Sequence, residues 1–517
     1  MNNKLKTTDD TLGRNFVRVA RANWRRRCIS DSSGKGLTYG QTLISVFTIA
    51  EKISKMAFGQ ENVGIILPPS VAGALVNLAV TLVGKVAVNL NYTASAGARK
   101  CAVEQCRLGC IISSRQFLKK AGIDENDNRF VFIEDIIADI GFGQMAKAYF
   151  KARFARAGKI EAREIATIIF SSGTTGKPKG VMLSHGNILS NIEAIRAVIN
   201  IKRQDNLCAV LPFFHSFGFM CGLWLPLIAG ASAGYIAKGF DGAEVGCQAR
   251  KNRSTILFAP PTFLSHYVRR TKSEEFATLR LVFAGAEKLK KRLAEEFEAK
   301  FGVRPLEGYG MTELSPVVSL NLPGQNKEGT VGKALLGVSV KIVDEQNGQV
   351  LAPESEGLVM VKGPNVMIGY LNMPKKTDEV LKDGWYNTGD LGCLDSEGYL
   401  TITDRLSRFS KIAGEMVGHL GVENVYLDRL GMHEQVVAVT SVPDEKKGEE
   451  LVVLYIDKAG DADRLHQIMA ESDLPNMWKP RRSNYIRIES MPAVGSGKLD
   501  IDGLHNIALA AKESGTY

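Results

Sequence analysis

The sequence predicts an α/β protein with a large N-terminal domain and a small C-terminal domain, on the strength of three observations. The chain has 517 residues, which is long enough for several domains. Its first 160 residues alternate strand-like and helix-like runs, the pattern of a parallel sheet covered by helices. After Arg405 the pattern changes to a compact α+β unit. We therefore expect an N-terminal domain of helix-covered sheets over residues 1–404, with a small mobile domain over residues 405–517.

The N-terminal alternation can be followed run by run. Residues 36–57 indicate a short strand that leads into an amphipathic helix, and residues 62–70 indicate an apolar strand that ends in Pro-Pro-Ser. Residues 71–84 have helical spacing and end at a glycine, and residues 86–91 again indicate a strand. Short alternating strands with turns over residues 334–361 predict a small β unit within this domain.

The C-terminal part has its own order of elements. The runs EQVVAVTSV, ELVVLYIDK, DADRLHQIMAES and NYIRIES predict strand, strand, helix and strand. We place the boundary between the two domains near Asp404–Arg405, where the preceding β pattern ends.

Composition excludes several classes of protein. The chain is 45% hydrophobic, 23% charged and 8% aromatic, which excludes disordered, collagenous and disulfide-scaffold proteins. Eight cysteines and the absence of an apolar signal segment lead us to expect free thiols and a cytoplasmic protein. Cys101, Cys106 and Cys110 have no fourth cysteine nearby, so we interpret them as structural. The net charge of +10 permits an acidic partner without choosing among nucleic acid, anionic lipid and acidic protein.

Two segments leave alternatives open. Residues 207–237 carry no charge, but prolines interrupt the run, so we predict core that could line an apolar ligand tunnel and no transmembrane helix. Phe213, Phe214 and Trp224 lie in this run. Residues 145–159 combine aromatic residues with five cations and predict a helix. We favour a solvated surface helix there, with adhesion to the anionic inner face of a membrane as the alternative.

The strongest signal for chemistry is ATIIFSSGTTGKPKGVMLSH, residues 166–185. A β run empties into a loop of Ser, Gly and Thr that is followed by lysines. Such a loop offers backbone N–H groups, hydroxyls and cations to phosphate oxygens. It does not have the glycine spacing of a Walker A loop.

The stretch FSSGTTGKPKG resembles the phosphate loop of the adenylate-forming, or acyl-activating, superfamily. Seven further stretches resemble the other motifs of that superfamily in order along nearly the whole chain: LPFFHSFG (211–218), GYGMTE (308–313), WYNTGDLG (385–392), TITDRLSR (401–408), KIAGEMV (411–417), LPNMWKP (474–480) and PAVGSGKLD (492–500). The resemblance implies that a carboxylate and ATP form an acyl-adenylate and pyrophosphate, and that a thioester then forms.

The resemblance also implies roles for individual residues. Thr174 and Glu313 would help to hold Mg²⁺, which such a reaction between two anions needs. The β- and γ-phosphates of ATP would be wrapped by Ser171, Ser172, Gly173, Thr175, Gly176 and Lys177. Tyr309 would stack on adenine beside Gly308, and Asp390 and Arg405 would bind the ribose. His215 belongs to the segment at the acyl site.

Lys498 would contact the carboxylate and the α-phosphate during adenylation, from a Gly-Ser-Gly-Lys loop of the C-terminal domain. The hinge between the domains would lie near Ser407, where many members of the superfamily have Asp or Lys. We expect the C-terminal domain to reorient between the two steps, because the arriving thiol needs the space that Lys498 occupies.

The amino-acid sequences of three segments, residues 404–423, 24–43 and 85–95, are similar to those of bacterial acyl-acyl carrier protein synthetases. These enzymes are the ligase half of the bifunctional acylglycerophosphoethanolamine acyltransferase/synthetase. This predicts a medium- or long-chain fatty acid as substrate and acyl carrier protein as acceptor, with coenzyme A as the alternative, and no nucleic acid as partner. No His has Asp five positions further on, so we expect no acyltransferase activity. The positive net charge agrees with an acidic carrier protein.

Overall fold

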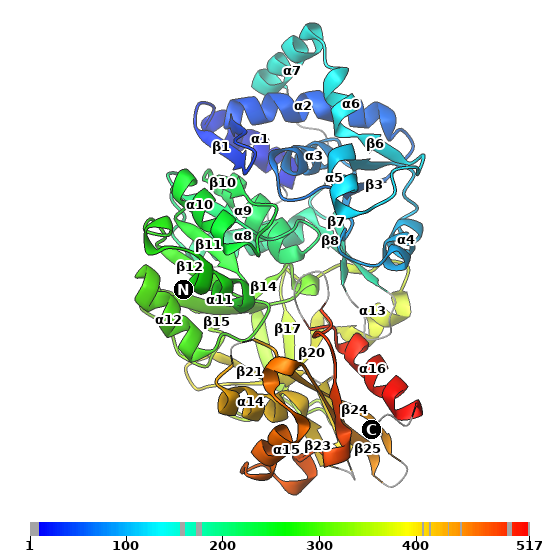
Figure 1. Cartoon of the computed structure of the whole chain (residues 1–517). Coiled ribbons are helices and arrows are strands. Elements are labelled where there is room, and N and C mark those ends of the chain that lie inside the picture. Colours follow the sequence, from blue (N-terminus) through cyan, green and yellow to red (C-terminus); the bar gives the residue numbers. More distant parts are fainter. Residues whose placement is uncertain are drawn as a thin grey trace.

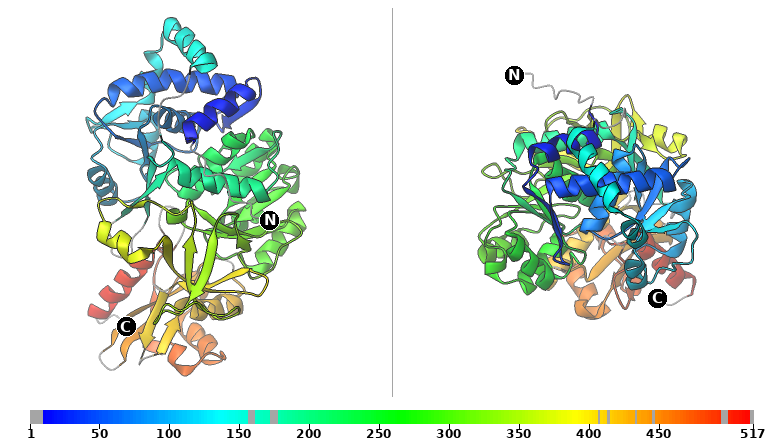
Figure 2. Two further views of the ribbon diagram at one scale, coloured as in Figure 1. Left: turned by 180° about the vertical axis from the view of Figure 1, so that it is seen from behind. Right: turned by 90° about the horizontal axis from the view of Figure 1, so that it is seen from above.

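Three β-sheets and their covering helices form the N-terminal domain, and a smaller set of strands and helices forms the C-terminal domain (Figure 1). The structure is a computed structural model that describes residues 10–155, 161–171, 178–405, 408–412, 415–432, 434–444, 447–493 and 499–514. The two domains lie at opposite ends of an elongated molecule (Figures 1 and 2). This arrangement confirms the predicted mixed α/β class.

The first sheet has the strand order β15-β14-β13-β12-β11-β9-β10-β1-β2. Its strands are β1 (Arg27–Asp31), β2 (Gly36–Thr38), β9 (Asn206–Ala209), β10 (Ser232–Tyr235), β11 (Ile256–Ala259), β12 (Leu281–Ala284), β13 (Pro305–Gly310), β14 (Val317–Leu320) and β15 (Lys333–Ala334). The run from β1 through β10, β9, β11 and β12 to β13 is parallel. The carboxyl ends of these strands therefore share one edge.

The second sheet has the order β18-β8-β7-β4-β3-β5-β6. It consists of β3 (Asn62–Ile66), β4 (Val86–Asn89), β5 (Ile111–Ser113), β6 (Phe130–Phe132), β7 (Ile165–Ser171), β8 (Lys179–Ser184) and β18 (Gly369–Tyr370). The two sheets share the N-terminal part of the chain in a way that the sequence does not reveal. β1 pairs with β10, about 200 residues further along the chain, and β3 and β4 belong to the second sheet.

The third sheet, largely antiparallel, joins β16 (Ser339–Val343), β17 (Gly357–Lys362), β19 (Leu381–Lys382), β20 (Trp385–Leu394) and β21 (Leu400–Arg405). The β unit predicted over residues 334–361 is therefore present, but it is larger than expected, because β20 and β21 extend it to Arg405.

Helices cover the first two sheets: α1 (Leu12–Ala22), α2 (Tyr39–Met56), α3 (Val71–Leu82), α4 (Ala96–Gln105), α5 (Arg115–Ala121), α6 (Ile133–Ala138), α7 (Phe142–Phe154), α8 (His185–Val198), α9 (Leu225–Ala229), α10 (Gly242–Asn252), α11 (Pro261–Arg270) and α12 (Lys291–Phe301), with α13 (Pro374–Val380) beside β18. Hydroxyl side chains begin six of them. At α1, α2, α3, α4, α5 and α8, the N–H of the third helical residue donates to the side chain of Thr11, Thr38, Ser70, Ser95, Ser114 and Ser184, respectively. The three strands and two helices predicted over residues 36–91 are confirmed.

The C-terminal domain contains β24 (Val437–Asp444), β25 (Gly448–Tyr455), α15 (Ala462–Ala470) and β26 (Tyr485–Arg487) in the predicted order. A hairpin of β22 (Phe409–Ile412) and β23 (Glu415–Gly418) and the helices α14 (His419–Leu430) and α16 (Ile501–Glu513) complete it. Its apolar cores lie on the two faces of the β24-β25-β26 sheet.

The uncharged run 207–237 folds into β9, the one-turn π-helix η1 (Gly218–Trp224), α9 and β10. Trp224 and Phe213 are fully buried in the main core, which explains why this run carries no charge. Among the described residues, no helix is long and apolar enough to cross a membrane. Cys106 and Cys110 are buried, as expected for structural cysteines, and Cys101 is partly exposed.

Candidate active site

The segment predicted to bind phosphates connects β7 to β8. β7 and β8 are antiparallel, and Ser171 at the end of β7 pairs with Lys179 at the start of β8. Ser172, Gly173, Thr174, Thr175, Gly176 and Lys177 lie outside the described residues. The strand pairing therefore brings Ser171 and Lys179 together at the two ends of this segment.

Asp390, Arg405 and Tyr309 form a contact network at the third sheet. Asp390 and Arg405 are direct partners in the β20–β21 register, and Arg405 Nε lies 3.2 Å from Asp390 Oδ1. The Tyr309 hydroxyl donates a hydrogen bond to Asp390 Oδ2. Burial of its hydroxyl and the neighbouring Asp390 charge hold the pKa of Tyr309 well above its ordinary value. The residues predicted for adenine and ribose are thus brought together, although 81 residues separate Tyr309 from Asp390.

Glu313 lies in a second group with two tyrosines and a lysine. Its side chain is buried, and Oε1 accepts a hydrogen bond of 3.0 Å from the Tyr370 hydroxyl, which lies 3.3 Å from that of Tyr386. Lys179 Nζ lies 5.6 Å from the centre of the Tyr370 ring. Burial lowers the pKa of Lys179; the charges of Lys376 and Arg405 also lower it, and Glu313 opposes them.

Sequence reasoning missed Lys179, Tyr370 and Tyr386. Lys179 was within reach, because it stands in the same loop motif as Lys177. Tyr386 stands in the motif WYNTGDLG together with Asp390, so it too was within reach. Tyr370 carries no local signal, since it lies in β18, which pairs with the distant β8.

His215 follows the carboxyl end of β9, at the edge that also carries Tyr309. Its ring is half-buried and lies 4.6 Å from the Phe214 ring. The next residue, Ser216, has its hydroxyl 3.1 Å from the hydroxyl of Thr312, beside Glu313. The predicted acyl segment and the segment of Tyr309 and Glu313 are therefore in contact.

Gly308 is explained by a close approach of two strands. A Cβ at this position would lie 2.6 Å from Leu320 Cδ1 and 3.1 Å from the Ser319 carbonyl oxygen of β14. A side chain would force Leu320 Cδ1 aside and press on the carbonyl of Ser319, which is the strand partner of Tyr309. Glycine at position 308 therefore allows β13 and β14 to approach closely beside Tyr309.

Lys498 and Ser407 also lie outside the described residues, but the residues around them are informative. Ala493 and Leu499 form a β-bridge on either side of the Lys498 loop, and Asp502 of α16 interacts electrostatically with Lys179. Before Ser407, Arg405 is bound to Asp390 of the third sheet. After it, Arg408 forms an ion pair with the buried Glu423 of α14. Ser407 thus stands between an arginine bound to the third sheet and an arginine bound to the C-terminal domain.

The side chains of the candidate site can be compared with the ligands that Mg²⁺ prefers. This ion prefers carboxylate oxygen and is commonly held by one or two carboxylates together with substrate phosphates. Glu313 supplies one buried carboxylate whose charge acts on Lys179, and the described residues hold no cluster of three acidic or His/Cys ligands. The site therefore fits a magnesium ion that arrives with a polyphosphate and does not fit an all-protein cage.

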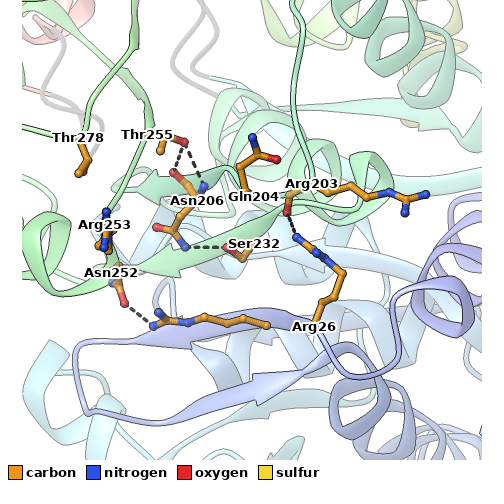
Figure 3. Close-up of a pocket in the computed structure, with 10 residues that line it drawn as sticks. Arg26, Arg203, Gln204, Asn206, Ser232, Asn252, Arg253, Thr255 and Thr278 are labelled. Atoms are coloured by element: carbon orange, nitrogen blue, oxygen red, sulfur yellow. Dashed lines mark hydrogen bonds between the residues drawn. The ribbon is translucent and has the colours of Figure 1, made fainter.

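A polar pocket of about 680 Å³ lies elsewhere, at the opposite edge of the first sheet (Figure 3). Asn206 begins β9, Ser232 begins β10 and Thr255 precedes β11, so the pocket faces the amino ends of these strands. Asn206 donates to the Ser232 hydroxyl, and the Thr255 hydroxyl accepts from the Asn206 N–H. This pocket is separate from the residues described above.

The fold is that of the adenylate-forming superfamily. Residues 16–371 match the family described as AMP-binding enzyme, and the chain belongs to this family. It is 33% identical over 302 residues to the long-chain-fatty-acid–CoA ligase of Bacillus subtilis, covering 57% of this chain and 53% of that one. It is 31% identical over 347 residues to the medium-chain fatty-acid–CoA ligase of Escherichia coli, covering 65% and 60%. The chain therefore spans little more than half of these two relatives.

Solved structures match over nearly the whole chain. The o-succinylbenzoate CoA synthetase of Bacillus subtilis with its acyl-adenylate intermediate has a TM-score of 0.81 and 26% identity, covering 96% of this chain and 98% of that one. The same synthetase with ATP and magnesium has a TM-score of 0.81 and 25% identity, covering 95% and 99%. MatB from Rhodopseudomonas palustris with ATP bound has a TM-score of 0.81 and 25% identity, covering 96% and 98%.

Proposed function

We propose that this protein activates a medium- or long-chain fatty acid with ATP and then transfers the acyl group to the phosphopantetheine thiol of an acyl carrier protein. In the first step a carboxylate oxygen attacks the α-phosphorus and pyrophosphate leaves. In the second step the thiol sulfur attacks the acyl carbonyl and AMP leaves. The contact between Tyr309, Asp390 and Arg405 is the observation that carries the proposal.

Asp390 would accept the ribose hydroxyls. Tyr309 and Arg405 each occupy one of its carboxylate oxygens, but a carboxylate has about four acceptor positions, so ribose hydroxyls can bind beside them. The two protein contacts fix the orientation of the carboxylate before ATP arrives. This lowers the cost of ordering the site on binding.

The cations would bind the phosphates. Lys179, Lys376 and Arg405 repel one another, which contributes to the lowered pKa of Lys179. A polyphosphate would relieve this repulsion and gain charge-assisted hydrogen bonds. Mg²⁺, when bound, would neutralise part of the phosphate charge, with Glu313 and Thr174 as its protein ligands.

Lys498 would supply the remaining cation, between the attacking carboxylate and the α-phosphate. The electrostatic interaction of Asp502 with Lys179 supports an approach of this part of the C-terminal domain to the phosphate loop. The boundary at Asp404–Arg405 would act as a hinge that withdraws Lys498 before the thiol arrives.

The acceptor has two candidates. The similarity of residues 404–423 to acyl carrier protein synthetases and the net charge of +10 favour an acidic carrier protein. The names of the two fatty-acid relatives favour coenzyme A. To decide, the protein is incubated with ATP, Mg²⁺, palmitate and either acceptor. We expect the palmitoyl thioester of the carrier protein to form faster than palmitoyl-CoA. If only palmitoyl-CoA forms, coenzyme A is the acceptor and the carrier protein is not.

Acyl-chain length tests the substrate class separately from the acceptor. Each buried methylene contributes about 0.8 kcal/mol, so KM should fall about fourfold per methylene until the site is filled. Pyrophosphate exchange with acids from C2 to C18 measures this without any thiol. Activation of acetate as efficient as that of a C12–C16 acid would contradict a fatty-acid site.

A further inference from the structure

Most of the exposed large hydrophobic side chains are gathered at one end of the molecule. Of the twelve such residues in the described part of the chain, eight lie in two short segments, residues 56–58 and 137–154. We call these eight the apolar crest: Met56, Phe58, Ile137, Phe142, Met145, Tyr149, Phe150 and Phe154. Single exposed hydrophobic residues are normal on protein surfaces, but a group of this size marks an interaction site.

Five of the eight crest residues lie on α7, which protrudes at the end farthest from the C-terminal domain (Figures 1 and 2). Ala148 and Ala152 are its buried residues, and α7 packs on α2. At 100° per residue, Phe142, Tyr149, Phe150 and Phe154 share an arc of roughly 140°. Phe142 is 88% exposed and Phe154 is 72% exposed, so the arc faces solvent.

Arginines gather beside the crest. Arg21, Trp24, Arg25, Arg26, Tyr149 and Arg153 line a pocket of about 490 Å³, and among the residues that line it none is a carboxylate. We call it the arginine pocket. Burial and the positive charge of Arg153 lower the pKa of Arg21. Arg26 also lines the polar pocket of Figure 3 and donates to the Arg203 carbonyl oxygen.

The arginine pocket is built onto the helix. Arg21 donates hydrogen bonds to the carbonyl oxygens of Ala152 and Ala155, at the end of α7. The Trp24 and Tyr149 rings meet edge to face at 6.0 Å, and the Arg153 guanidinium lies 5.2 Å from the centre of the Trp24 ring. Cations and apolar side chains are therefore held as one rigid face. On the other flank of α7, Lys147 and Lys151 both form ion pairs with Glu51 of α2.

We propose that this face docks on a bilayer of anionic phospholipid, with the apolar crest at the boundary of headgroups and acyl chains and the arginine pocket on the lipid phosphates. A convex helix with protruding aromatic side chains suits a fluid surface, whereas a protein partner would need a matching groove. Aromatic residues beside cations are typical of segments that bind at the membrane interface. Guanidinium forks match phosphate geometry. The proposal does not rest on the catalytic activity.

The test is sedimentation of the full chain with vesicles of phosphatidylcholine alone and of phosphatidylcholine containing phosphatidylglycerol. We expect binding to the anionic vesicles only. Each cation near such a surface adds about fivefold in affinity, so Arg25→Gln/Arg153→Gln should bind about 25-fold more weakly. Phe150→Ser/Phe154→Ser should lose about tenfold or more. The control Arg292→Gln/Arg464→Gln removes the same charge from exposed arginines elsewhere and should bind like the wild type.

Circular dichroism and thermal unfolding establish that each variant is folded, and quenching of Trp24 fluorescence by brominated acyl chains reports depth. Quenching that is retained in Trp24→Phe would contradict the placement of the pocket at the membrane. Equal binding to neutral vesicles, wild-type binding by both double variants, or no binding would overturn the proposal. So would binding of inorganic phosphate without binding of vesicles, or a dimer that the phenylalanine substitutions dissociate.

Discussion

The candidate active site and the arginine pocket both bring several cations together. At the active site carboxylates lie next to the cations, whereas no carboxylate lines the arginine pocket. At the active site Arg405 contacts Asp390, and Lys179 lies near Glu313. In the arginine pocket four guanidinium groups meet without a lining carboxylate. Paired charges hold a fixed geometry for a small ligand, whereas unpaired surface charges attract an extended anionic partner. The two regions should therefore fail separately when they are mutated.

Substitution of Lys498 should have the largest effect. Lys498→Ala removes a charge used mainly in the adenylation transition state, so pyrophosphate exchange should fall about 10²–10³-fold while ATP affinity barely changes. Thioester formation from pre-made acyl-adenylate and binding to anionic vesicles should both persist. Equal loss of both half-reactions would refute the assigned role.

Asp390→Asn tests the paired arrangement. The amide keeps the size of the side chain but loses the charge opposite Arg405 and one acceptor for Tyr309. Hydrogen bonds to charged groups contribute about 1.5–3 kcal/mol, so KM for ATP should rise about 10- to 100-fold, with a smaller change in KM for the fatty acid. A change confined to the fatty acid would place Asp390 at the wrong substrate.

Ser407→Pro tests whether the two domains must move. Proline fixes φ between Arg405, which is bound to the third sheet, and Arg408, which is bound to α14. One half-reaction should stay near the wild-type rate and the other should fall at least about tenfold, as expected when the backbone can adopt only one of two conformations. Pyrophosphate exchange measures the first step and acyl transfer from isolated adenylate the second. Wild-type rates in both would show that the motion does not pass through residue 407.

Substitution of Glu307 should have the smallest effect, and it can be measured as a change in the pH dependence of the free energy of unfolding. Burial raises the pKa of Glu307 from 4.5 to about 7. Because the folded state holds this proton more tightly than the unfolded state, stability is lost as pH rises from about 4.5 to 7. At about 1.4 kcal/mol per pH unit, Glu307→Gln should stabilise the protein by at most about 3 kcal/mol at pH 8, and hardly at all at pH 4.

Denaturant unfolding at pH 4 and pH 8 measures this difference. The exposed Glu274→Gln serves as the control and should show no pH-dependent gain. A gain for Glu307→Gln that is equal at both pH values would mean that packing, and not ionisation, is responsible.

Local pattern determined much of this protein in advance. The periodicity of residues 36–91 predicts the strand and helices that are found, because side-chain spacing reports directly which face is buried. The run 207–237 lies in the core because an uncharged, largely apolar segment is more stable when buried than when exposed to water. Tyr309, Asp390 and Arg405 could be named from the motifs that carry them, since each motif keeps its residue types in a short window.

Only the tertiary structure shows which of these short sequence segments come into contact. Pairing of β1 with β10 and of β18 with β8 joins strands that lie far apart in the sequence, and no short window records it. Pairing of β18 with β8 and of β20 with β17 accompanies the contacts among Tyr370, Tyr386 and Glu313. The arginine pocket arises where the end of α1 meets α7, about 130 residues later, so its charges were visible in the sequence but their convergence was not. Contacts across such distances depend on the packing of the whole domain, which is why the sequence alone could not supply them.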